Sequence, residues 1–145
     1  MIGLDTSFLI DLYWLDSPRH MGAVNLFNSL SDERYINEQI CIYYNCFNEF
    51  LHVITDSRRF DSAISIEKAL DIVEQWRMID RVKIVFPTEM SFCRTLTWLS
   101  VYKLRRKRLN DTNMAACYAA LGVSSIITAN PHDFEILKVF NTINY

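Results

Sequence analysis

The chain has 145 residues, of which 50% are hydrophobic and 13% aromatic, which is enough for one folded domain with a core of its own. The formal net charge of −2 excludes the strongly basic surface that many nucleic-acid-binding proteins carry. No apolar run reaches the about 20 residues that span a bilayer, and the first residues lack the basic start of a signal peptide. We therefore expect a cytoplasmic protein with no membrane partner.

Segments typical of strands alternate with segments typical of helices along the chain. The apolar stretch MIGLD predicts a buried strand, and Ser17 and Pro18 are typical of the start of a helix over residues 19–30. Further strands are predicted over QICIY, RVKIVF, SSIIT and, at an edge, NTINY, and further helices over residues 45–55, 63–79, 88–107, 111–121 and 131–137. This alternation predicts a single α/β domain, residues 1–145, with a parallel sheet of four to five strands flanked by helices.

The four cysteines give no sign of a zinc site or of a disulfide framework. Cys41, Cys46, Cys93 and Cys117 form no CxxC pair, and no histidine stands at zinc-finger spacing from two of them. We therefore expect the cysteines to be small apolar core residues.

Ligands of parallel α/β folds bind outside the carboxyl ends of the strands, and polar residues stand at two predicted strand ends. Asp5 ends the first strand, and Thr128 and Asn130 end SSIIT. Asp5 is either a carboxylate in a cleft or the N-cap of a turn that starts at Thr6 and Ser7.

Two further carboxylates belong to predicted helices. Glu49 lies at the border of the apolar stripe of its helix, where it is either a solvated rim residue or a group that reaches into a cleft. Asp111 opens its helix, so that Asn110 or Asp111 would make a good N-cap. The positive end of the helix dipole also keeps a carboxylate ionised, as a metal ligand must be.

The segment TANPHDF and the basic run KLRRKR each have two interpretations. Asn130 or Asp133 could supply an oxygen to a site at the strand end, whereas Asp133 could equally cap a short helix that begins at Phe134. The basic run, residues 103–108, is either the solvated end of a helix or a phosphate-contact patch. Arg58 and Arg59 form a second, weaker candidate patch.

Acidic side chains from distant stretches of the chain are predicted to meet at one edge of the sheet. Asp5, Glu49 and Asp111 would meet there with Asn130 or Asp133, and carboxylates gathered without Arg or Lys would repel one another and raise one another's pKa values. A hard divalent cation removes that conflict, and oxygen ligands suit Mg²⁺ or Mn²⁺ and not zinc.

The motifs MIGLDTSFLIDL, FNEFLHVI and LNDTNMAACYAALGVSSIITANPHDF resemble the ordered motifs of the PIN-domain ribonucleases, and most closely those of VapC-like toxins. The resemblance implies a PIN-like three-layer domain and a metal-dependent endoribonuclease that uses Mg²⁺ or Mn²⁺ and leaves a 5′-phosphate and a 3′-hydroxyl. It implies that Asp5 and Asp111 are metal ligands and that Glu49 completes the catalytic acidic cluster. It also implies a homodimer and a small antitoxin that blocks the cleft.

The resemblance assigns roles to further residues as well. At the fourth acidic position of the family this chain offers Asn130, a neutral oxygen ligand, and leaves Asp133 to compensate. Thr6, Ser7 and Thr128 are expected near the site. The residues expected to contact phosphates of the RNA substrate are Arg105, Arg106, Lys107 and Arg108.

Other classes of protein fit the sequence less well. A phosphotransferase of the haloacid-dehalogenase type needs a second Asp two positions after the first, where Ser7 stands. A receiver domain needs an Asp at the end of a middle strand and a Lys at the end of a later one, and neither ICIYYN nor SSIITAN supplies them. The remaining alternative is a catalytically inactive PIN scaffold that acts as a protein- or RNA-binding module.

Overall fold

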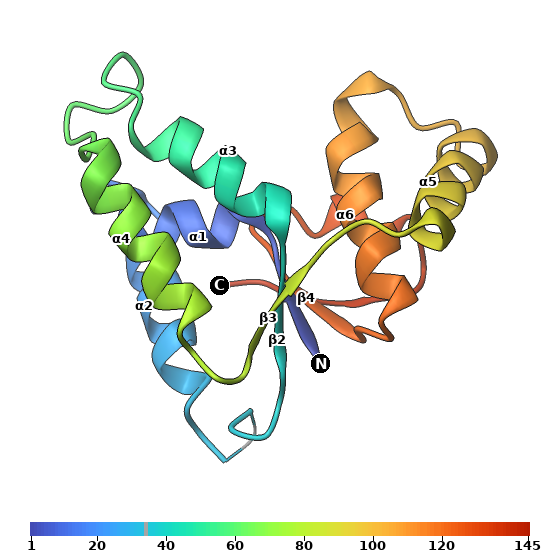
Figure 1. Cartoon of the computed structure of the whole chain (residues 1–145), viewed down its shortest axis with the longest axis horizontal. Helices are drawn as coiled ribbons and strands as arrows, with labels where there is room; N and C mark the ends of the chain where they lie inside the picture. The colour runs from blue at the N-terminus through green and yellow to red at the C-terminus, as the bar shows by residue number, and fades with distance from the viewer. Residues whose placement is uncertain (34) are drawn as a thin grey trace.

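A parallel β-sheet forms the centre of the protein, whose computed structural model describes residues 1–33 and 35–145 (Figure 1). Over these residues the sheet has five strands in the order β3-β2-β1-β4-β5, and every neighbouring pair is parallel. The strands are β1 (Ile2–Leu4), β2 (Ile40–Tyr43), β3 (Val82–Val85), β4 (Ser125–Ile127) and β5 (Asn141–Ile143). All five predicted strands are therefore confirmed, including the edge position of the last one.

Helices cover both faces of the sheet, so that the domain has three layers. Figure 1 shows α1 to α4 on one side of the strands and α5 and α6 on the other. The helices of the described residues are α1 (Thr6–Tyr13), α2 (His20–Ser29), α3 (Tyr44–Ile54), α4 (Ile66–Arg77), α5 (Glu89–Val101), α6 (Leu109–Ala120) and α7 (His132–Glu135), with a 3₁₀ turn at Arg106–Arg108. The predicted α/β class is confirmed.

One helix was not predicted, and several helix boundaries differ from the prediction. The helix α1 follows β1 directly, in a stretch for which no helix was predicted. The helix α5 ends at Val101, because the backbone reverses at Lys103 with φ of 51°. The basic run 103–108 is therefore a loop and a 3₁₀ turn, and its interpretation as the end of a helix is wrong.

The starts of α2 and α6 also differ from the predicted starts. Helix α2 begins at His20, and the Ser17 hydroxyl accepts a hydrogen bond from the Arg19 N–H in the turn before it. Helix α6 begins at Leu109 and not at Asp111, with Arg108 at the N-cap position. Asp111 therefore lies inside the first turn of α6, where its carboxylate still faces the positive end of the helix dipole.

The ends of β1 and β2 are held together by one side chain of α6. The Tyr118 hydroxyl donates to the Leu4 carbonyl (2.6 Å) and accepts from the Tyr43 N–H (2.9 Å). Its ring crosses β1 at Gly3, where an added Cβ would come within 2.6 Å of the ring. Tyr118 thus fixes α6 against the strand ends that immediately precede Asp5 and Tyr44.

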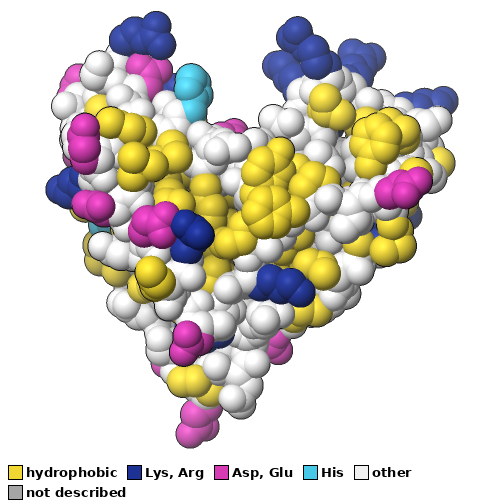
Figure 2. All heavy atoms as spheres, viewed as in Figure 1, with side chains coloured by type: hydrophobic (Ala, Val, Ile, Leu, Met, Phe, Trp, Pro, Cys, Tyr) yellow, Lys and Arg dark blue, Asp and Glu magenta, His cyan; other side chains and the backbone are white. Residues whose placement is uncertain are grey.

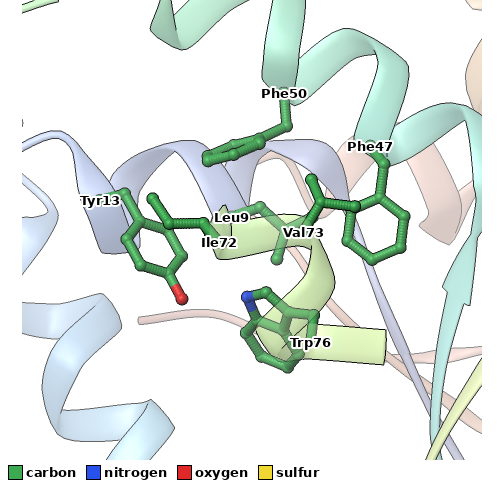
Figure 3. Close-up of a pocket in the computed structure, with 7 residues that line it drawn as sticks. All are labelled: Leu9, Tyr13, Phe47, Phe50, Ile72, Val73 and Trp76. Carbon is green, nitrogen blue, oxygen red and sulfur yellow. The ribbon is translucent and has the colours of Figure 1, made fainter. Parts of the chain in front are cut away.

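The apolar space among α1, α3 and α4 is part of the core. Figure 3 shows the residues around it, which are Leu9, Tyr13, Phe47, Phe50, Ile72, Val73 and Trp76. The space among them is too small for a water molecule, so this space is side-chain packing and not a binding site.

The prediction for the cysteines is confirmed at three positions and wrong at one. Cys41, Cys46 and Cys117 are buried, whereas Cys93 is exposed on α5. Separately, none of the helices in residues 1–33 and 35–145 is long and apolar enough to span a membrane.

Replacing Tyr118 by Phe is expected to lower the free energy of unfolding by about 1–3 kcal/mol, because two buried backbone groups lose their partner. Urea unfolding monitored by circular dichroism measures this change. The matched control is Tyr102→Phe, which removes the hydroxyl of a half-buried tyrosine at the end of α5. Equal losses in the two variants would show that Tyr118 has no special role at the strand ends.

Candidate functional site

A small hollow of about 10 Å³, with room for about one water molecule, lies at the carboxyl ends of β1 and β2. It brings together Asp5 from the end of β1, Glu49 from α3 and Asp111 from α6, three of the residues predicted to meet there. Figure 2 shows the surface indented between the two arms of the molecule, which Figure 1 identifies as those that carry α3 and α6. The described residues that line the hollow are Asp5, Thr6, Tyr43, Asn45, Cys46, Glu49, Asn110, Asp111 and Met114, and they include no Lys, Arg or His.

Hydrogen bonds at the carboxyl ends of β1 and β4 fix the position of Asp5. Its N–H donates to the Ile127 carbonyl (3.0 Å), which extends the β1–β4 pairing by one residue. Its side chain is 8% exposed, and Oδ2 accepts two hydrogen bonds, one from the Ser7 hydroxyl (2.6 Å) and one from the Thr128 hydroxyl (2.7 Å). Asp5 does stand at the N-cap position of α1, but its carboxylate binds these hydroxyls instead of capping the helix.

Glu49 lies at the rim of the hollow. Its side chain is exposed on α3, and Oε2 accepts a hydrogen bond from the Thr6 hydroxyl (2.9 Å). Because Thr6 follows Asp5 directly, this bond connects α3 to the start of α1 beside the first carboxylate. Glu49 is therefore exposed to solvent, as the first interpretation holds, and it also borders the hollow, as the second holds.

The carboxylates of the hollow repel one another. The pKa of Asp111 is raised to about 6 by burial and, to a smaller extent, by the charges of Asp5 and Glu49, against the opposing effect of Arg108. Burial also raises the pKa of Asp5, and so does the charge of Glu49, whereas the hydrogen bonds from Ser7 and Thr128 lower it. An ionised pair at these positions therefore needs a positive charge that the lining residues do not supply.

Arg108 lies beside the hollow and is largely engaged elsewhere. Its guanidinium binds the carboxylate and the backbone carbonyl of Asp133, and its Nε lies 4.0 Å from Asp111 Oδ2. Asp133 is thereby paired with an arginine and does not cap α7, which begins at His132. Asn130 is exposed, and its N–H donates to the Thr128 hydroxyl (2.9 Å). Neither Asn130 nor Asp133 is among the described residues that line the hollow.

The remaining predicted residues surround the three carboxylates. Thr6, Ser7 and Thr128 all bind a carboxylate of the site, as the preceding bonds show. The lining residues not predicted from the sequence as site residues are Tyr43, Asn45, Cys46, Asn110 and Met114. Tyr43 is the last residue of β2 and Asn45 lies two positions after it, so the rule that sites form at strand ends could have identified them.

The carboxylates of the hollow suit a hard cation that keeps several water ligands better than a cation whose ligands all come from the protein. In residues 1–33 and 35–145, no three side chains of Asp, Glu, His or Cys are arranged to hold a metal ion between them. The three carboxylates nevertheless face one hollow, and burial raises the pKa values of Asp5 and Asp111. Mg²⁺ usually keeps several waters and takes only one or two carboxylates, so these residues fit an ion that is bound partly through water.

Comparison with known proteins gives matches of two kinds. A family model described as PIN domain matches residues 2–138. Among solved structures, VapBC-1 from nontypeable Haemophilus influenzae has a TM-score of 0.70 at 17% identity and covers 99% of this chain and 98% of its own. A search of curated proteins found no match by sequence.

Two further solved structures have a similar fold. VapC20 from Mycobacterium tuberculosis, a sarcin–ricin loop cleaving toxin, has a TM-score of 0.65 at 18% identity and covers 87% of each chain. A toxin–antitoxin complex from Klebsiella pneumoniae has a TM-score of 0.60 at 19% identity and covers 92% of this chain and 90% of its own. At these identities the likeness establishes the fold.

Replacing Asp111 by Asn is expected to stabilise the metal-free protein at pH 7. The folded-state pKa of Asp111, about 6, is above the ordinary value of 3.8, so its ionisation opposes folding at pH 7. The stability of the wild type should therefore rise as the pH falls from 7 through 6 towards 4, and Asp111→Asn should flatten this rise.

Urea unfolding in a chelating buffer at pH 7 and pH 5 measures the effect. The matched control is Asp71→Asn, at an exposed position on α4. If the wild type and Asp111→Asn gain the same stability on acidification, the folded state does not raise the pKa of Asp111.

Proposed function

Since this chain belongs to the PIN-domain family, we propose that it is a metal-dependent endoribonuclease that hydrolyses RNA phosphodiester bonds with Mg²⁺ or Mn²⁺. The observation that carries the proposal is the meeting of Asp5, Glu49 and Asp111 in one hollow whose described lining has no basic side chain. A divalent cation is the simplest counter-charge for such a set, and a phosphodiester is the substrate that such a cation activates.

The proposed roles follow from the contacts of each side chain. Asp5 and Asp111 would hold the cation, with Glu49 close by at the rim. When bound, the cation lowers the pKa of a bound water for attack on phosphorus and neutralises developing negative charge. The Ser7 and Thr128 hydroxyls both donate to Oδ2 of Asp5, which favours its ionised form and fixes its orientation. We expect products with a 5′-phosphate and a 3′-hydroxyl.

The basic residues before α6 are the proposed RNA contacts. Arg105, Arg106 and Lys107 are exposed, and the chain runs from them through Arg108 to Asn110 at the hollow. Figure 2 shows Lys and Arg side chains at the ends of both arms that border the indentation. Such residues would bind flanking phosphates and so compensate for the net negative charge of the chain. Arg108 would contribute while it remains paired with Asp133.

The fold neighbours support a proposed role as the toxin of a toxin–antitoxin system, because they include a toxin and a toxin–antitoxin complex. We propose a small antitoxin protein as the partner that covers the cleft, and the cytoplasm as the place of action. We also propose a homodimer, because Phe86, Met90 and Phe92 are each more than half exposed. Figure 2 shows hydrophobic side chains gathered on this face of the molecule.

Replacing Asp5 by Asn is expected to reduce RNA cleavage by at least about 100-fold, because a neutral amide is a poor ligand for a hard cation. Asparagine keeps an oxygen for the Ser7 and Thr128 hydroxyls, so the circular dichroism spectrum should not change. The assay incubates the protein with total cellular RNA, with and without Mn²⁺, and maps the cut ends.

The control for this assay is the exposed Asp71→Asn, which should cleave as the wild type does. Cleavage by Asp5→Asn at the wild-type rate would contradict the assignment of Asp5. A wild-type protein that binds RNA without cutting it would instead support the inactive scaffold.

Replacing both Arg106 and Lys107 by Gln is expected to weaken RNA binding and to make it less dependent on salt. Each phosphate contact that is lost should reduce the slope of log affinity against log salt by roughly 0.7 for single-stranded RNA. Fluorescence anisotropy with the cleavage-deficient Asp5→Asn background measures this slope. The pair Arg58→Gln and Arg59→Gln serves as the comparison, and an unchanged slope in the Arg106 and Lys107 variant would contradict the proposed contacts.

A further inference from the structure

Two aromatic side chains are stacked at the carboxyl ends of β2 and β3. The ring of Tyr44, the first residue of α3, is nearly parallel to the ring of Phe86, the first residue after β3. The angle between the two rings is 17°, and their centroids are 5.5 Å apart. Tyr44 is half-buried, whereas Phe86 is 63% exposed although it is apolar. The stacked pair therefore presents an aromatic surface to solvent.

Neighbouring residues hold this pair in place. The ring of Tyr44 lies edge-on against that of Tyr43, with 4.9 Å between the centroids. The Tyr43 hydroxyl in turn accepts a hydrogen bond from the side-chain amide of Asn113 on α6 (2.9 Å). On the other side, Pro87 restricts the backbone of Phe86 to extended conformations. The aromatic surface is thus formed before a ligand binds, so that binding to it costs little conformational entropy.

The stacked pair lies beside the hollow. Tyr43 and Asn45, which flank Tyr44 in the sequence, both line the hollow. Asp5 and Phe86 directly follow two strands, β1 and β3, that have only β2 between them. The ends of these two strands are therefore two strand spacings, roughly 10 Å, apart. In Figure 1 the chain leaves β3 and crosses between the two arms to α5, and Figure 2 shows hydrophobic side chains in the indentation there.

An exposed, rigid aromatic surface next to a site for a phosphodiester suits an unpaired nucleobase. Every base has a flat π-face, and proteins that bind single-stranded nucleic acid stack such bases on aromatic side chains. The described lining of the hollow has no basic side chain, so a base that stacks nearby adds affinity without bringing a cation close to the carboxylates. Bases within a duplex are already stacked on their neighbours and do not offer a free face.

We propose that Phe86, supported by Tyr44, stacks on an unpaired base of the RNA beside the phosphodiester bound at the hollow. This inference rests on the proposed RNA substrate, and it specifies a single-stranded segment as the part that is recognised. Phe86 is one of three exposed residues on which the homodimer is proposed. The other two, Met90 and Phe92, belong to α5, and they remain for the contact between two copies.

The test compares two RNA probes of equal length, about 12 nucleotides, which is within the site sizes of single-strand binders. One probe is oligoadenylate, and the other is an abasic RNA that keeps the riboses and phosphates but has no bases. Fluorescence anisotropy measures their affinities in the cleavage-deficient Asp5→Asn background. Phe86→Leu should lower the affinity for oligoadenylate about fivefold or more, because leucine has no ring on which a base can stack. The affinity for the abasic probe should not change.

Two further variants control for effects other than stacking. Phe86→Trp should keep the affinity for oligoadenylate, because an indole ring also stacks on bases. Phe92→Leu, at a position on α5 that is 56% exposed, should keep the wild-type ratio of the two affinities. Equal losses for both probes in Phe86→Leu, or a Phe86→Trp variant that binds oligoadenylate as weakly as Phe86→Leu, would overturn the proposal. So would a changed oligomeric state of Phe86→Leu in sedimentation velocity, which would place Phe86 between two copies.

The outcomes distinguish this proposal from the proposed function. If Phe86→Leu loses affinity for oligoadenylate alone but the wild type cuts no RNA with Mn²⁺, the nuclease activity is contradicted and the stacking role stands. If the wild type cuts RNA and Phe86→Leu binds both probes as before, the stacking role alone is contradicted.

Discussion

Repulsion among Asp5, Glu49 and Asp111 is the constraint on which the candidate site depends. The parallel sheet ends β1 and β2 at the same edge, and Tyr118 fixes α6 against those ends. Three carboxylates from distant parts of the chain therefore share one hollow, and burial raises the pKa values of two of them. Because the described lining includes no basic residue, the ionised carboxylates have no counter-charge within the hollow, which is the basis for proposing a bound cation.

The chain compensates for this repulsion only in part. Two hydroxyls donate to one oxygen of Asp5, and they stabilise its ionised form without adding a charge. Arg108 supplies a positive charge at 4.0 Å from Asp111, but its closest bonds are to Asp133. Asp111 consequently keeps a pKa of about 6. The two hydroxyls lower the pKa of Asp5 and Arg108 lowers that of Asp111, yet both pKa values remain raised.

Local patterns predicted the sheet and the three carboxylates, because strand periodicity and the rule for strand ends depend on neighbouring residues. Local patterns did not predict the features that depend on contacts between distant parts of the chain. The end of α5 at Val101 depends on a left-handed residue that propensity does not reveal, and α1 was missed because its short apolar stretch continues from β1. The pairing of Arg108 with Asp133 joins two turns that are 25 residues apart, so no local pattern could separate Asp133 from the site.

The most direct measurement is the anomalous difference map of a crystal grown with Mn²⁺. The proposed site predicts a peak in the hollow, within about 2.0–2.5 Å of an oxygen of Asp5 or Asp111 and completed by ordered waters. A hollow without a peak, with the Arg108 guanidinium turned from Asp133 into the space between the two aspartates, would contradict it. In that case the chain would supply its own counter-charge, and no cation would be needed.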